Sequence, residues 1–171
     1  MIRDATADDA AACAAIYAPY VTGTAITFEY EPPSAEEMAR RIAGATGSHA
    51  WVVHEDAGRV TGYAYAGPYK DRAAYRWTCE VSVYTETGRR RTGAGRALYD
   101  GLFQRLVARG YHLALAGVTL PNEASEGLHK AMGFEVVGVH AQIGWKLGRW
   151  HDVARMQKRL VAAEGPPADP R

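Results

Sequence analysis

The stretch that decides the fold is Thr78-Cys79-Glu80-Val81-Ser82-Val83-Tyr84, which leads through the basic loop Arg89-Arg90-Arg91-Thr92-Gly93-Ala94-Gly95-Arg96 into a helical pattern. Apolar and polar residues alternate along the first run, which indicates a β-strand with two unlike faces. One face is expected to pack in the core and carries Trp77, Cys79, Val81 and Val83. The other is expected to form the wall of a polar cleft and carries Thr78, Glu80, Ser82 and Tyr84.

The helix after the loop presents Leu98, Leu102 and Leu106 on one side and is expected to end at Gly110. A strand, a glycine-containing turn and a helix start have the geometry of an anion site, because glycine lets the backbone approach a ligand and the first-turn N–H groups are unpaired. Taken alone, the turn favours a plain surface loop with solvated charge. It is not a Walker loop, since no Gly-Lys-Ser/Thr follows, nor a dinucleotide loop, since position 98 is leucine.

Composition limits the function classes. The chain has 171 residues, which suits one domain, and is 47% hydrophobic and 23% charged with a formal net charge of +1. This balance gives no general attraction to nucleic acid or to a membrane, and no apolar run reaches membrane-spanning length. Two cysteines without ligand spacing predict neither a disulfide framework nor a metal site. The N-terminus lacks a hydrophobic signal core, so we expect a cytoplasmic protein.

The other elements predict an α/β fold with a mixed sheet and helices on both sides, in the order β-α-α-β-β-β-α-β-α-β-β. Strands are expected at 1–3, 50–54, 59–69, 75–84, 113–120, 134–140 and 153–160, helices at 8–17, 35–43, 94–109 and 122–132, and an aromatic loop at 145–150. Ligands in such sheets bind at the carboxyl ends of strands where the path of the chain diverges, which is where the opening stretch lies. We expect one domain, residues 1–160, and a disordered tail, residues 161–171.

The loop Arg90-Arg91-Thr92-Gly93-Ala94-Gly95 fits the pattern R/Q-x-x-G-x-G/A and resembles the pyrophosphate-binding segment of the GNAT acyl-CoA N-acyltransferases. The likeness covers about residues 2–160 and is greatest to the phosphinothricin and methionine sulfoximine acetyltransferase branch. Five further strings carry it in the right order: 64–70 (AYAGPYK), 75–80 (YRWTCE), 120–122 (LPN), 128–134 (LHKAMGF) and 148–153 (GRWHDV).

The resemblance implies direct transfer of an acetyl group from acetyl-CoA to an amine. An amine attacks only when unprotonated, so Glu80 on the polar face of the central strand is our candidate base, acting through a water. The alternative is a surface carboxylate or an ion-pair partner. The resemblance further implies that backbone N–H near Val83 holds the carbonyl oxygen and that the coenzyme arm pairs with the strand edge. The implied coenzyme-binding residues are Val83, Tyr84, Thr85, Arg90, Arg91, Thr92, Gly93, Ala94, Gly95, Arg96 and Asn122.

His129 is the second chemical candidate, because an imidazole can protonate a departing thiolate or accept the amine proton near neutral pH. The alternative is a histidine packed on the side of its helix. Asn122 is expected to bond the coenzyme, to cap the helix that follows, or both.

For the acceptor, the resemblance implies an amino acid or analogue such as phosphinothricin or methionine sulfoximine, whose acidic group calls for cations. Lys70 and Arg72 precede the central strand and are the candidates, with solvated loop charge as the alternative. Phe28, Tyr75 and Ser82 are expected to shape the pocket. The resemblance also implies a homodimer. Rival hypotheses are a transferase for another amine, such as a peptide N-terminus, and a non-catalytic acyl-CoA-binding module.

Overall fold

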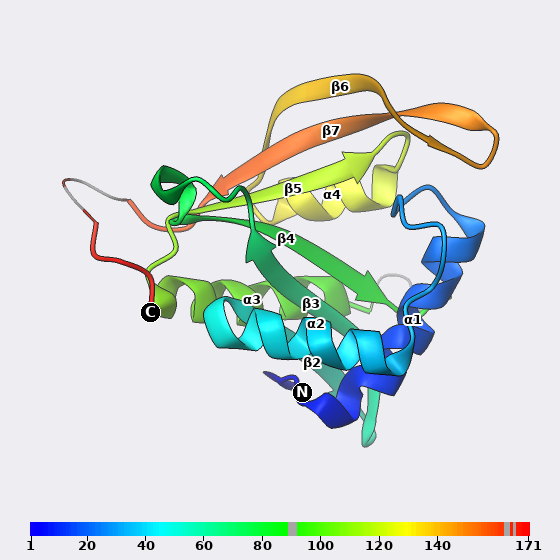
Figure 1. Cartoon of the computed structure of the whole chain (residues 1–171), viewed down its shortest axis with the longest axis horizontal. Coiled ribbons are helices and arrows are strands. Elements are labelled where there is room, and N and C mark those ends of the chain that lie inside the picture. Colours follow the sequence, from blue (N-terminus) through cyan, green and yellow to red (C-terminus); the bar gives the residue numbers. More distant parts are fainter. Residues whose placement is uncertain (89–91, 163–164, 166) are drawn as a thin grey trace.

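A mixed sheet with helices on both faces forms the frame of the molecule (Figure 1). The computed structural model describes residues 1–88, 92–162, 165 and 167–171. Within these residues, the sheet has seven strands in the order β1-β2-β3-β4-β5-β7-β6. The strands are β1 (Ile2–Asp4), β2 (Ala50–Asp56), β3 (Arg59–Pro68), β4 (Thr78–Thr85), β5 (Leu113–Thr119), β6 (Glu135–Lys146) and β7 (Arg149–Arg159), and the helices are α1 (Ala10–Gly23), α2 (Ala35–Ser48), α3 (Ala94–Arg109) and α4 (Glu123–Ala131). This confirms the predicted class and element order.

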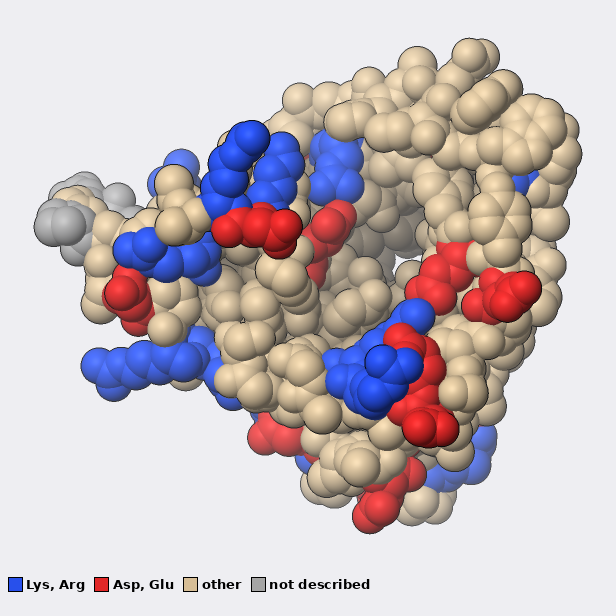
Figure 2. Space-filling model, viewed as in Figure 1, with Lys and Arg blue, Asp and Glu red and all other residues tan. Residues whose placement is uncertain are grey.

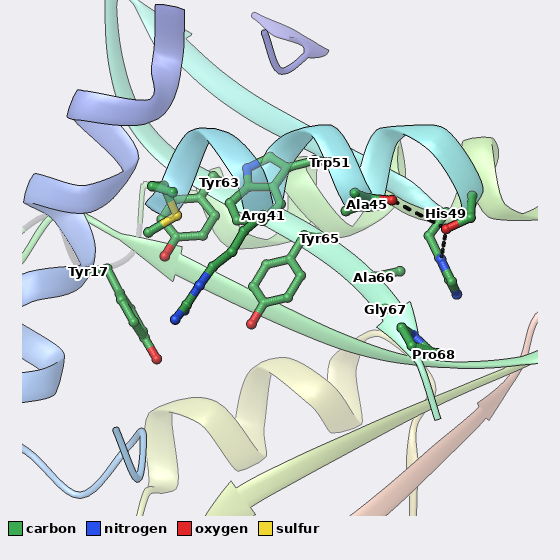
Figure 3. Close-up of a pocket in the computed structure, with 13 residues that line it drawn as sticks. Tyr17, Arg41, Ala45, His49, Trp51, Tyr63, Tyr65, Ala66, Gly67 and Pro68 are labelled. Carbon is green, nitrogen blue, oxygen red and sulfur yellow. Dashed lines mark hydrogen bonds between the residues drawn. The ribbon is translucent and has the colours of Figure 1, made fainter. Parts of the chain in front are cut away.

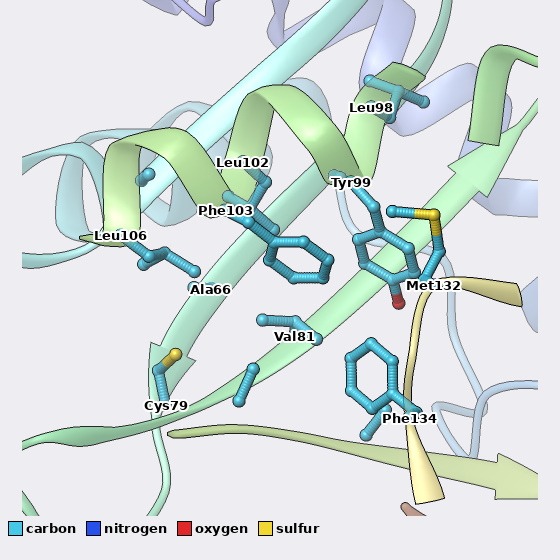
Figure 4. Packing of buried hydrophobic residues seen from close by; sticks show 14 of the residues in the cluster. Ala66, Cys79, Val81, Leu98, Tyr99, Leu102, Phe103, Leu106, Met132 and Phe134 are labelled. Carbon is cyan, nitrogen blue, oxygen red and sulfur yellow. The ribbon is translucent and has the colours of Figure 1, made fainter. Parts of the chain in front are cut away.

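Alternation along the central strands divides the core into two clusters, one on each face of the sheet. Val52, Ala64 and Val81 belong to the cluster that packs against the leucine side of α3, together with Tyr99, Met132 and Phe134 (Figure 4). Residues of opposite parity on the same strands, including Trp51, Tyr63 and Tyr84, pack under α1 and α2. Tyr84 therefore lies on the predicted cleft face but is sealed by α1, with its ring 4.8 Å from that of Tyr17.

The sheet opens between β4 and β5. These two strands run parallel and pair only over Thr78–Glu80 with Leu113–Leu115. Beyond that point β4 continues to Thr85 and β5 to Thr119 without pairing to each other, and β5 then pairs with β7 along its whole length. Within the described residues, the side of β4 that faces β5 consequently has no strand partner from Val81 to Tyr84.

Two predicted helices are longer in the structure. Helix α1 continues through Pro19 to Gly23, because Val21 beyond the proline is buried against the sheet. Helix α2 begins as predicted, with the Ser34 side chain accepting a hydrogen bond from the Glu37 N–H (3.1 Å), but ends at Ser48 and not at residue 43. The predicted α3 is confirmed at Ala94–Arg109, and α4 begins after its cap Asn122.

The predicted aromatic loop at 145–150 was wrong. Residues 145–146 end β6 and residues 149–150 begin β7, joined by a tight turn in which Leu147 (φ 51°) and Gly148 (φ 74°) are left-handed. Apolar residues alternate too irregularly here for a strand to be read from the sequence, because the outer face of the hairpin is itself apolar. None of the helices in the described part of the chain combines the length and apolar character needed to cross a bilayer.

The described part of the C-terminal tail is attached to the domain. The Trp77 Nε1–H group donates to the Ala168 carbonyl oxygen (2.8 Å), and the Arg76 guanidinium pairs with Asp169 (2.8 Å). The Arg171 N–H group donates to the Arg109 carbonyl oxygen at the end of α3 (2.9 Å). Residues 167–171 therefore differ from the free tail that composition predicted, while the division at residue 160 stays a prediction.

Candidate functional site

A cleft of about 800 Å³ lies on the α1 side of the sheet, next to the point where β4 and β5 part. The space-filling view shows this hollow between the β6–β7 hairpin above and α2 below (Figure 2). Its size suits a small organic molecule. The cleft is lined by Ile26, Phe28, Tyr69, Lys70, Tyr75, Thr78, Leu113, Leu115, Gly117, Thr119, Val137, Gly138, His140, Ile143, Val153, Arg155 and Gln157.

Glu80 meets Arg155 at the edge of this cleft. The Arg155 Nη1 atom lies 3.0 Å from Glu80 Oε1, and the two side chains are 27% and 40% exposed. The Glu80 side chain is thus accessible to solvent. Among the described residues, its second oxygen, Oε2, has no hydrogen-bond partner. Glu80 was predicted to be either a base or an ion-pair partner. The structure shows the ion pair with Arg155, and this pair occupies only one of the two carboxylate oxygens.

The loop between α1 and α2 forms one wall of the cleft by resting on the hairpin. Phe28 lies over Gly144, where a side chain would collide with it, because an added Cβ would be 2.2 Å from the Phe28 ring. The Lys146 ammonium is buried and donates to the Thr27 carbonyl oxygen (2.7 Å), and Tyr30 donates to the Trp145 carbonyl oxygen. Burial lowers the pKa of Lys146. Phe28 therefore lines the cleft as predicted, held by contacts that the sequence did not reveal.

The predicted acceptor-binding residues separate into two groups. Lys70 and Tyr75 line the cleft, and the Lys70 ammonium lies 5.5 Å from the centre of the Tyr75 ring. Arg72 is exposed in the same loop but does not line the cleft. Ser82 lies on β4 opposite Tyr65, half-buried and outside the cleft lining. The structure thus brings Phe28, Lys70 and Tyr75 to the cleft.

The start of α3 lies beside the parting of the sheet. Gly93 is left-handed (φ 78°), and the Ala94 N–H group donates to the Thr92 hydroxyl (3.4 Å). Gly95 packs against α4, where an added Cβ would be 3.1 Å from Leu128. Arg96 is exposed. Arg90 and Arg91 lie outside the described residues, so their predicted contacts have no structural counterpart here.

Asn122 and Thr85 make contacts within the protein. The Asn122 side chain accepts a hydrogen bond from the Ser125 N–H group (3.1 Å), which is the predicted helix cap. The Thr85 carbonyl oxygen at the end of β4 accepts a hydrogen bond from Tyr20 (2.7 Å). Val83 is partly buried against the α3 cluster, and its backbone lies on the unpaired stretch of β4.

His129 is enclosed on the α3 side of the sheet. Its Nε2 atom lies 2.8 Å from the hydroxyl of Tyr99, and its Nδ1 atom lies 2.7 Å from the Ser125 carbonyl oxygen. The side chain is 4% exposed and stands edge-on to the rings of Tyr99 and Phe134. Burial lowers its pKa, and the hydrogen bond to the Ser125 backbone opposes this in part. The structure does not bring His129 to the cleft that holds Glu80.

A second, smaller cavity of about 250 Å³ lies between α2 and the β2–β3 part of the sheet (Figure 3). Stacked rings of Trp51, Tyr63 and Tyr65 line it. The polar ends of Tyr17, Arg41 and Tyr65 point to the same side of it. Arg41 is bound by Glu29 (2.7 Å) and Glu37 (2.9 Å), and Tyr17 also donates to Glu29 (3.0 Å). Because Arg41 already forms ion pairs with both carboxylates, we do not assign it to ligand binding.

Sequence reasoning missed Arg155 and Gly117. Alternation in β7 carried the signal for the first, because Ala154 and Met156 are buried while Arg155 and Gln157 point into the cleft. Gly117 gave no signal of its own, since a glycine inside a strand has meaning only when its neighbours in space are known.

No group of three His, Cys, Asp or Glu side chains in the described ranges is arranged to hold a metal ion.

The mixed sheet, the helix that begins at a glycine turn, and the carboxylate of the central strand beside a cleft were predicted, and the parting of β4 and β5 is added by the structure. The family model described as an acetyltransferase (GNAT) domain matches residues 2–154, and the chain belongs to this family.

Relatives with named activities match nearly the whole chain. The phosphinothricin N-acetyltransferase of Streptomyces viridochromogenes is 38% identical over 99% of this chain and 91% of its own length. The L-methionine sulfoximine/L-methionine sulfone acetyltransferase of Pseudomonas aeruginosa is 35% identical over 97% of this chain and 98% of its own length.

Solved structures agree. A phosphinothricin acetyltransferase from Sinorhizobium meliloti in complex with AcCoA matches with a TM-score of 0.89 and 39% identity, covering 93% of this chain and 87% of that one. A ribosomal-protein-alanine N-acetyltransferase from Brucella melitensis matches with a TM-score of 0.89 and 35% identity, over 93% and 99% of the two chains. The predicted family and fold are therefore confirmed, and the chain is an N-acetyltransferase of this class.

Proposed function

We propose that the chain transfers an acetyl group from acetyl-CoA to the α-amine of a small amino acid or analogue of the phosphinothricin or methionine sulfoximine type. The observation that carries the proposal is the place of Glu80, which is partly exposed and contacts the cleft residue Arg155 where β4 leaves β5. The relatives named above supply the substrate class. The cleft supplies the residues that this chemistry requires.

The residues around the parting fit acetyl-CoA. The edge of β4 from Val81 to Tyr84, which has no strand partner among the described residues, offers backbone groups that an extended amide arm can pair with, as an added strand would. The first turn of α3, at Ala94 to Arg96, offers N–H groups without intrahelical partners at the positive end of the helix dipole. When bound there, the coenzyme supplies the activated acetyl group. Arg90, Arg91, Thr92 and Gly93 complete the proposed phosphate site by sequence.

Glu80 serves as the general base in this proposal. An α-ammonium group must lose a proton before its nitrogen can attack, and the free Oε2 atom can accept that proton directly or through a water. A backbone N–H near Val83 steadies the oxygen of the acyl group as negative charge develops. His129 supports α4 in this scheme, because both of its ring nitrogens are already bonded inside the protein.

We further propose a homodimer formed through the β6–β7 hairpin. Its large apolar side chains are about half exposed, from 48% to 58%, and they are Val136, Val137, Val139, Ile143, Trp145, Leu147 and Trp150. The surface over the hairpin in Figure 2 is almost free of charged residues. A patch of this kind marks an interface in most folded proteins, and a second copy presents the same patch. Val139→Asp is expected to convert the dimer to a monomer in sedimentation experiments, whereas Val107→Asp, at an exposed position of α3, leaves it intact.

The direct test is a thiol-release assay with acetyl-CoA against phosphinothricin, methionine sulfoximine, methionine sulfone and the common amino acids. We expect turnover with at least one free α-amino acid. The similarity to a ribosomal-protein-alanine N-acetyltransferase favours a peptide N-terminus as the second candidate, so an Ala-initiated peptide belongs in the panel. Turnover with the peptide alone would replace the amino acid proposal, and coenzyme binding without turnover would indicate a non-catalytic module. A cytoplasmic location stays a prediction.

A further inference from the structure

Arg155 reaches Glu80 by crossing a glycine. In the sheet, Arg155 on β7 is the register partner of Gly117 on β5, and Glu80 lies on β4 beyond it. A Cβ atom at Gly117 would lie 3.0 Å from Arg155 Nη1 and 3.9 Å from Glu80 Oε1. The missing side chain at position 117 therefore leaves room over β5 for the guanidinium where it meets the carboxylate.

Most of the guanidinium remains available after this contact. Only Nη1 is bonded, to Glu80 Oε1 at 3.0 Å, while Nε and Nη2 have no partner among the described residues. Arginine presents its donors in a rigid fork that matches the two oxygens of a carboxylate. The Nε and Nη2 donors of Arg155 are thus available to bind an anion in the cleft.

Positively charged side chains line the cleft, and one negatively charged side chain lies at its edge. Lys70 and Arg155 are the ionised groups among its lining residues, and Glu80 stands beside Arg155 at the edge. An α-amino acid carries its amine and its carboxylate on one carbon, so the two groups must bind to neighbouring sites of opposite charge. Glu80 and Arg155, already in contact, offer such a pair of sites.

We propose that Arg155, given its path across the gap at Gly117, binds the α-carboxylate of the acceptor and selects α-amino acids over amines that lack this group. The proposal rests on the proposed function and names the residue that sets its acceptor class. In this arrangement, Arg155 holds the carboxylate while the amine on the same carbon lies at Glu80. Lys70, which also lines the cleft, is left for a second acidic group on the acceptor side chain.

The test measures acceptor binding separately from turnover. Calorimetry in the presence of CoA, which cannot donate an acetyl group, compares methionine sulfone with its carboxamide for the wild type, Arg155→Met and Arg155→Lys. We expect Arg155→Met to weaken binding of the acid by about ten- to a hundredfold, the usual weight of a hydrogen-bonded charge, while binding of the carboxamide changes less than about threefold. Arg155→Lys is expected to restore part of the difference.

Gly117→Val supplies an independent variant, because it leaves Arg155 in place but fills the gap beneath the guanidinium. It should reproduce the selective loss of the acid. Equal weakening of acid and carboxamide in both variants, or no change in either, would overturn the proposal.

If the wild type binds the acid selectively yet acetylates nothing, the proposed function fails while the assignment of Arg155 stands. If Arg155→Met still acetylates α-amino acids selectively, the assignment of Arg155 fails while the proposed function stands.

Discussion

Glu80 and His129 were both predicted to move protons, yet the structure gives them opposite surroundings. Glu80 is 40% exposed at the edge of the cleft, with one oxygen unpaired among the described residues. His129 is 4% exposed on the other side of the sheet, with a hydrogen bond on each ring nitrogen. A matching string places a residue on an element, but whether the residue can reach a substrate depends on what packs around it. The contrast makes Glu80 the stronger candidate for proton transfer.

The largest expected effect is that of Glu80→Gln. The amide keeps the shape of the side chain and the contact with Arg155 but cannot accept a proton from the amine. We expect kcat to fall by about 10²- to 10⁴-fold, the usual contribution of a general base. Coenzyme affinity, measured by calorimetry, should be unchanged, because Glu80 lies outside the proposed coenzyme contacts. Unchanged turnover would reject the role of Glu80.

His129→Gln provides the matched test on the other side of the sheet. Glutamine can keep a hydrogen bond to Tyr99 but cannot shuttle a proton near neutral pH. If His129 only supports α4, kcat should fall less than about tenfold, well below the loss of a general acid. A loss as large as that of Glu80→Gln would erase the contrast and return the predicted acid role to His129.

The elements of the fold that could be predicted from the sequence are those whose pattern involves residues close together in the chain. The central strand, helix α3 and the cap Asn122 were predicted correctly, because periodicity and capping act between residues close in the chain. Both strands of the hairpin were predicted, but too short: their continuation to the turn at 147–148 was missed because the outer face is apolar there, which hides the alternation that marks a strand.

The site itself shows the same limit. Lys70 and Tyr75 were predicted for the acceptor pocket from strings that match the family, and Phe28 from a looser match, and all three line the cleft. Glu80 lies beside them at its edge, against Arg155. Arg155 was not found, because its meaning depends on a glycine 38 positions earlier in the chain and on the strand order β4-β5-β7. Contacts of that kind are made by the sheet and carry no local signature.

Tyr99→Phe tests the enclosure of His129 with a smaller change. The Tyr99 ring is fully buried in the α3 cluster (Figure 4). Removal of its hydroxyl leaves His129 Nε2 without its partner. We expect the free energy of unfolding in urea to fall by about 1–3 kcal/mol, the cost of an unsatisfied buried group, with kcat unchanged. Tyr111→Phe is the control, since it also removes a buried tyrosine hydroxyl bond (2.9 Å to the Ser48 carbonyl oxygen) but far from α4. A kcat that falls only for Tyr99→Phe would connect the pair to catalysis.

The smallest expected effect is a pH dependence of stability. Burial holds the pKa of His129 below its ordinary value of 6.5, and His49 is shifted in the same direction by burial and by Arg109. The unfolded chain therefore binds protons that the folded chain refuses, so stability is full above pH 6.5 and declines as the pH falls toward the folded pKa values. Each histidine can contribute at most about 1.4 kcal/mol per pH unit. Urea titrations between pH 7.5 and 5 should show the decline, and His129→Gln and His49→Gln should each remove a part of it. An equal decline in the wild type and in His129→Gln would show that His129 is protonated as readily in the folded chain as in the unfolded one, and that its enclosure has no electrostatic consequence.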